Sequence, residues 1–77
     1  MLHRIMIYLL FRYYKIDFFA DTKIEELGLS DYSLSVLKRH NLDTVEKVVL
    51  SYIDRVRYDG VSYGTYNDFF GIVSKEG

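Results

Sequence analysis

The sequence feature that most constrains the fold is a pair of helix signals on either side of a short turn, in residues 30–52. Ser30 precedes a run that begins with an acidic residue and ends with two basic ones, Lys38 and Arg39. A serine hydroxyl can accept a hydrogen bond from a free amide of the first helical turn, and the charges match the helix dipole. Asn41 tolerates the left-handed conformation that ends a helix. The pattern therefore predicts a capped helix that stops at this asparagine.

A second helix is predicted directly after the turn. Asp43 and Glu46 have the spacing of a capping box, in which side chains satisfy free backbone amides. Apolar residues then recur at helical spacing, at Val45, Val48, Val49, Tyr52, Ile53 and Val56. The middle of the chain is therefore expected to form two helices joined by a tight turn.

The residues around this pair resemble the C-terminal domain of the bacterial RNA polymerase alpha subunit. The likeness covers roughly residues 22–77 and is carried by Ile24-Glu25-Glu26-Leu27-Gly28-Leu29-Ser30, Ser33, Leu37-Lys38-Arg39 and Thr44-Val45-Glu46. The resemblance implies a small helical domain of helix-hairpin-helix type that contacts DNA and transcription proteins.

A short helical turn is expected before the pair. Thr22 and Glu25 have capping-box spacing, and Gly28 is expected to end the turn with a positive φ. Leu27 and Leu29 are then predicted to point into the core.

The remainder of the domain is expected to end in one more helix. Residues 54–59 are charged and are expected to contain a short helical turn, and residues 60–64 form a glycine-punctuated loop. Ser62 or Thr65 could cap the last helix, whose apolar face consists of Tyr66, Phe69, Phe70 and Val73.

Residues 1–21 form a separate segment that is apolar and basic. Its three basic residues, Arg4, Arg12 and Lys15, all precede the first acidic residue of the chain. The uninterrupted apolar run is far shorter than the ~20 residues of a membrane span, and no small-residue cleavage site follows it. We therefore expect neither an integral membrane span nor a signal peptide.

Both a helix and a strand are compatible with this segment. As a helix, its basic residues and Tyr8 fall on one stripe, whereas as a strand its aromatic content fits. The helix is favoured and the strand stays open. The segment is expected to pack on the domain or on a second copy, or else to lie on a membrane or partner as a basic amphipathic helix.

Composition excludes several chemistries. The chain has 77 residues, no Cys and two well-separated His, so it has room for one domain and no thiolate or disulfide chemistry. No nucleophile is paired with an oriented base, and no phosphate-binding glycine motif occurs. We therefore expect no catalytic residue, no metal site and no cofactor. The absence of Cys fits a cytoplasmic protein.

The resemblance supplies the candidate binding residues. On alignment, Tyr32 occupies the position of the family's main DNA-contacting arginine and Ser35 that of an asparagine, while Ser33 and Lys38 match. A second contact region is the glycine-containing turn, whose amides can bind phosphate; the family's basic pair is missing there. The full candidate set is Tyr32, Ser33, Ser35, Lys38, Arg39, Gly60, Ser62, Gly64 and Thr65.

The sequence thus predicts an all-α protein: a helix-hairpin-helix-like bundle of four short helices, plus the N-terminal helix or strand. The expected function is a non-enzymatic, transcription-related module that binds DNA weakly or docks on a transcription protein such as RNA polymerase or an activator. Protein is slightly favoured over DNA as the direct partner. The alternative is a homo-oligomeric or membrane-peripheral interaction protein that works through its apolar N-terminal segment.

Overall fold

The structure is a computed structural model that describes residues 2–55 and 57–74, with side chains from residue 5 onward. Its elements, in order, are the helix α1 (Leu2–Tyr13), the 3-10 helix η1 (Ile24–Glu26) and the helices α2 (Asp31–Arg39), α3 (Val45–Asp54) and α4 (Tyr63–Val73). Within these described ranges there is no strand. The prediction of an all-α protein is confirmed, and the N-terminal segment contains the helix Leu2–Tyr13 and no strand among its described residues.

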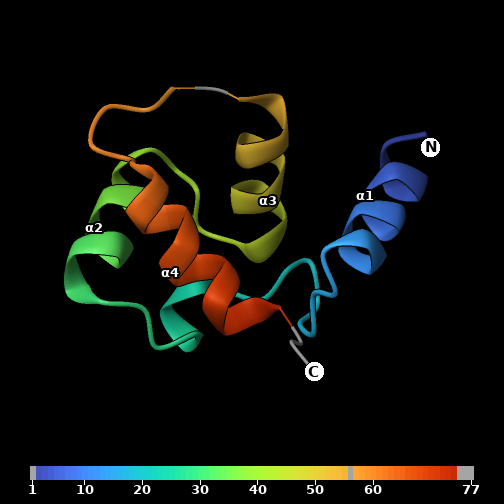
Figure 1. The fold of residues 1–77 in the computed structure, drawn as a ribbon, viewed down its shortest axis with the longest axis horizontal. Coiled ribbons are helices and arrows are strands. Elements are labelled where there is room, and N and C mark those ends of the chain that lie inside the picture. Colours follow the sequence, from blue (N-terminus) through green and yellow to red (C-terminus); the bar gives the residue numbers. More distant parts are fainter. Residues whose placement is uncertain (1, 56, 75–77) are drawn as a thin grey trace.

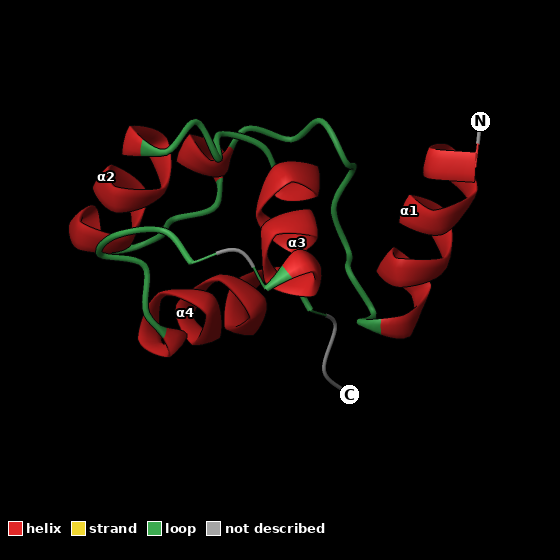
Figure 2. Cartoon of the chain, turned by 90° about the horizontal axis from the view of Figure 1, so that it is seen from above, coloured by secondary structure: helices red, strands yellow, loops and turns green. Residues whose placement is uncertain are grey.

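Three helices and η1 form the body of the molecule, while α1 lies to one side of it (Figures 1 and 2). The buried core is formed by apolar residues of η1, α2, α3 and α4 and of the turns beside them. It contains Ile24, Leu27, Leu29, Val36, Leu37, Leu42, Val45, Val48, Val49, Phe69 and Val73. Phe69 of α4 is its largest fully buried side chain, so α4 contributes a central part of the core.

The α2 helix ends as its sequence signals predict. The Ser30 side chain accepts a hydrogen bond from the Ser33 amide at 3.3 Å. After the helix, Asn41 has a φ of 62°, and Gly28 before it has a φ of 79°. These caps and turns are therefore confirmed.

Two predicted capping boxes are wrong. The N-cap of α3 is Thr44, whose side chain accepts from the Lys47 amide, while Asp43 forms an ion pair with the Lys47 ammonium at 3.0 Å. The N-cap of η1 is Lys23, not Thr22. An antiparallel bridge pairs these two N-cap residues, Lys23 and Thr44.

The predicted short helical turn in residues 54–59 is not found among the described residues. The α3 helix continues to Asp54, and Arg55 ends it with a φ of 55°; Val56 lies outside the described residues. The α4 helix begins at Tyr63, directly after the cap candidate Ser62, so Gly64 lies inside its first turn and not in the predicted loop.

The α4 helix begins after Ser62, one of the two predicted cap residues. Ser62 holds the N-cap position without a side-chain capping bond, and its carbonyl accepts from the amides of Thr65 and Tyr66. Of the two predicted candidates, Ser62 is the N-cap residue and Thr65 is not; the hydroxyl bond expected of the cap is not formed.

The residues that directly follow α1 are hydrogen-bonded to the end of α4. The Asp17 amide donates to the Val73 carbonyl at 2.8 Å, and the Ser74 hydroxyl donates to the Tyr14 carbonyl at 2.9 Å. The Tyr14 ring packs 5.3 Å from the Phe70 ring, and burial raises the pKa of its hydroxyl. The N-terminal segment therefore folds back on its own domain. No helix in the described part of the chain is both long and apolar enough to cross a membrane.

Candidate functional site

The two predicted contact regions meet at Tyr32 and Gly60. The Tyr32 hydroxyl donates a hydrogen bond to the Gly60 carbonyl at 3.0 Å. Gly60 has a φ of 87°, and a Cβ added there would lie 2.9 Å from Cγ2 of Val36. The loop before α4 therefore packs closely on α2, and only glycine fits this approach without strain.

The other end of α2 holds the same loop. The His40 Nε2–H donates to the Asp59 carbonyl at 2.7 Å, because a carbonyl oxygen can only accept. The His40 ring also lies 5.0 Å from the Tyr58 ring. His40 was interpreted from the sequence only as a helix C-terminal residue. Its bond to a carbonyl nineteen residues away could not be read from local spacing.

Three exposed residues of α2 share one stripe beside this contact. Tyr32, Ser35 and Arg39 are spaced by three and four residues, which places them on one face of a helix. Tyr32 keeps 63% of its surface exposed although its hydroxyl is bonded. We call Tyr32, Ser35, Arg39 and Gly60 the α2–loop surface.

Five of the predicted site residues lie outside this surface, and one of them, Ser62, lines the groove described below. Ser33 and Thr65 are buried, at 4% and 2% exposure. The Thr65 Oγ1 has no hydrogen-bond partner among the described residues. Lys38 forms an ion pair with Glu25 at 3.0 Å, and this hydrogen bond lowers the pKa of the Glu25 carboxyl. Gly64 is part of α4.

The charges around the α2–loop surface are mixed. Asp31 and Asp59 are the chain neighbours of Tyr32 and Gly60. The Asp68 carboxylate of α4 accepts from both the amide and the hydroxyl of Ser30, at 3.4 Å each. Arg39 is the basic residue of the surface. A phosphate backbone requires a concentration of positive charge, so this arrangement suits a polar protein surface better than duplex DNA.

A second surface feature was only partly visible in the sequence. An open groove of about 830 Å³ runs between the end of α3 and the start of α4. Its lining includes five tyrosines and two arginines: Tyr14, Ser51, Tyr52, Ile53, Arg55, Arg57, Tyr58, Val61, Ser62, Tyr63 and Tyr66. Inside it, the Ser51 Oγ and the Tyr66 hydroxyl are 2.9 Å apart and share a hydrogen bond. These tyrosines follow no single helical period, so no sequence pattern grouped them.

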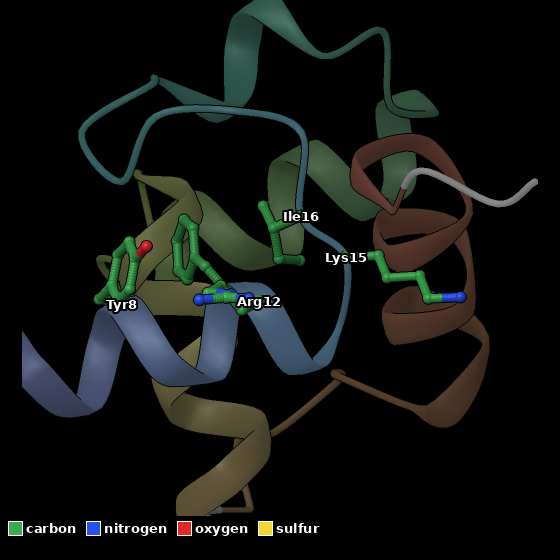
Figure 3. Close-up of a pocket in the computed structure, with 5 residues that line it drawn as sticks. Tyr8, Arg12, Lys15 and Ile16 are labelled. Carbon is green, nitrogen blue, oxygen red and sulfur yellow. The ribbon is translucent and has the colours of Figure 1, made fainter.

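A smaller hollow of about 400 Å³ lies on α1 and is lined by Tyr8, Phe11, Arg12, Lys15 and Ile16 (Figure 3). The Arg12 guanidinium carbon lies 5.8 Å from the centre of the Tyr8 ring, in the range of a cation–π contact. Figure 3 shows Lys15 extending away from this pair. The hollow is a notch beside the helix and holds no set of groups suited to catalysis.

In the part of the chain that the structure describes, no three His, Cys, Asp or Glu side chains are grouped to hold a metal ion. The chain was compared with protein-family models, curated proteins and solved structures, and none of them matches.

Proposed function

We propose that this protein is a non-enzymatic, transcription-related module that docks on a transcription protein through the α2–loop surface. The observation that carries the proposal is the hydrogen bond from Tyr32 to Gly60. It joins the two segments for which the resemblance to the polymerase alpha C-terminal domain implies binding. An exposed tyrosine held in place by its hydroxyl is a suitable centre for a protein interface, because little side-chain freedom is lost on binding.

Protein is the favoured partner over DNA. Tyr32 stands where the family has its DNA-contacting arginine, and Lys38 is engaged by Glu25. The acidic neighbours of the surface oppose phosphate binding further. Duplex DNA is therefore a weak ligand under this proposal, with RNA polymerase or an activator as the main partner and the cytoplasm as the location.

The test measures binding of the protein to purified bacterial RNA polymerase and, separately, to a short A·T-rich duplex at low and moderate salt. The variants are Tyr32→Ala and Arg39→Glu. Since Tyr32→Ala also removes the bond to Gly60, Arg39→Glu provides an exposed change that leaves this bond in place. The matched control is Phe19→Ala, which truncates an 83% exposed aromatic residue outside the surface.

We expect Tyr32→Ala to weaken polymerase binding about tenfold or more, the range of an aromatic hot spot. Arg39→Glu should weaken it less, Phe19→Ala should not change it, and duplex binding should be weaker and salt-sensitive. Absence of polymerase binding, or an equal loss with Phe19→Ala, contradicts the proposal. Tight duplex binding that is lost in Arg39→Glu shows that DNA is the direct partner.

A second candidate function is an interaction protein that works through α1, as a homo-oligomer or at a membrane surface. The observation in its favour is the exposure of large apolar side chains on α1: Ile5, Met6, Tyr8, Leu9 and Tyr13. A row of this kind on a small protein marks an interaction site.

A further inference from the structure

The α1 helix has one covered and one open apolar side. Ile7 is buried and Phe11 packs against the core cluster. At 3.6 residues per turn, Ile5, Leu9 and Tyr13 fall on a different side of the helix. These residues are 60%, 57% and 77% exposed. The body of the protein therefore leaves one apolar side of α1 without cover.

The charge of the chain is divided at the same place. Residues 1–16 carry three basic residues and no acidic one, whereas the rest of the chain carries seven basic and eleven acidic residues. Arg12 is exposed beside Tyr8, and Lys15 is exposed just after the helix (Figure 3). Arg12 therefore places positive charge next to the open side, Lys15 adds a second positive charge after the end of the helix, and the rest of the chain is net negative.

This charge distribution distinguishes between the two partners that could cover the open side, a second copy of the chain and a lipid surface. A second copy that paired through α1 would bring the same basic residues together, which opposes association. An anionic lipid surface attracts the basic residues and accepts the apolar ones, while it repels the acidic body. Of these two occupants, the lipid surface is the one that satisfies both the apolar pattern and the charge pattern.

We propose that the open side of α1, centred on Ile5, Leu9 and Tyr13, docks on an anionic lipid surface with Arg12 and Lys15 at the headgroups. Helix α1 lies along the interface, since its twelve residues are too few to span a bilayer. Tyr8 and Tyr13 have the apolar ring and polar hydroxyl that favour the headgroup boundary. The proposal rests on the second candidate function and is independent of the α2–loop surface.

The test is flotation of the full chain with phosphatidylcholine vesicles, with and without phosphatidylglycerol, at low and moderate salt. We expect binding only to the vesicles with phosphatidylglycerol, and less of it as salt rises. Leu9→Glu should reduce partitioning at least about tenfold, because a leucine no longer enters the interface. Arg12→Gln should reduce it about fivefold, the contribution of one basic residue near an anionic surface.

The matched control is Tyr63→Glu, the same kind of change at an 81% exposed position on α4. It should bind vesicles as the unchanged protein does. Circular dichroism checks the fold of each variant. If Leu9→Glu does not fold, Ile5→Glu takes its place, since that side chain is also exposed.

Three outcomes overturn the proposal. Equal binding to neutral vesicles removes the role of charge. No vesicle binding, together with a dimer that Leu9→Glu converts to a monomer in sedimentation, assigns the open side to a second copy. A monomer that binds no vesicle assigns it to another partner. The polymerase assay with Tyr32→Ala tests the α2–loop surface and does not depend on vesicle binding. Failure of the lipid proposal is therefore distinguishable from failure of the proposed docking function.

Discussion

The helices α1 and α2 are both amphipathic, yet they differ in how far their apolar residues are buried. On α2, Val36 and Leu37 are buried, and both ends of the helix hold the loop before α4 through Tyr32 and His40. On α1, Ile7 is buried while most neighbouring apolar residues stay exposed. Most helical stability in proteins comes from packing of the apolar face. The comparison shows that the same pattern marks a core helix in one place and an exposed surface in the other.

The largest expected effect tests this contrast with matched truncations. Phe69→Ala removes the largest fully buried side chain and should lower the free energy of unfolding by about 3–5 kcal/mol. Leu9→Ala on α1 should change it by less than about 0.5 kcal/mol, as at other exposed sites. Urea denaturation followed by circular dichroism measures both. Equal losses would mean that α1 is as well covered as the core.

The second effect tests the close approach of the loop to α2. Gly60→Ala places a Cβ 2.9 Å from Val36 at a position with a φ of 87°. We expect a loss of about 1–3 kcal/mol from strain and displacement. The control is Gly71→Ala, where an added Cβ meets nothing within 4 Å and alanine favours the helix by about 1 kcal/mol. A neutral Gly60→Ala would show that the loop is not held against α2.

A smaller effect comes from the hydroxyl of Tyr32. Tyr32→Phe removes its hydrogen bond to the Gly60 carbonyl and should lower stability by about 0.5–1.5 kcal/mol. Tyr63→Phe, on an exposed tyrosine of α4, serves as the control and should be close to neutral. Comparison of the two urea midpoints decides whether the bond persists in solution; equal midpoints would argue that it does not.

The smallest effect is a pH dependence at Glu25. The hydrogen bond from Lys38 lowers its pKa below the ordinary value of 4.5. A lowered carboxyl pKa stabilises the fold fully above the ordinary value, and this contribution is lost as the pH falls through the folded-state pKa. Lys38→Met should return the Glu25 pKa toward 4.5 and flatten the stability profile in this acidic range. An NMR titration of the carboxyl measures it, and an unchanged pKa would contradict the ion pair.

Local signals predicted the helices well and long-range contacts poorly. Ser30, Asn41 and Gly28 act within a few residues of themselves, so their caps and turns could be predicted from the sequence. The bridge between Lys23 and Thr44 joins residues twenty-one positions apart, which no local pattern encodes. The same applies to Tyr32, whose hydroxyl reaches a carbonyl in another loop.

The candidate site shows the same difference between what local signals predict and what depends on long-range packing. The sequence placed candidate residues on α2 and in the turn at Gly60, but it did not show which of them share an exposed stripe. It could not show that Ser33 and Thr65 are buried or that Lys38 pairs with Glu25. Serine and threonine fit both a surface and a core, and their exposure depends on how α2 and α4 pack together.

The most direct test of the account is hydrogen–deuterium exchange of the full chain with two ligands, purified bacterial RNA polymerase and phosphatidylglycerol-containing vesicles. The account predicts that polymerase slows exchange in residues 32–39 and 58–60 and leaves α1 unchanged, while vesicles slow exchange in α1 alone. Protection of the same residues by both ligands, or of α1 by polymerase, would contradict the claim that the protein carries two separate interaction surfaces.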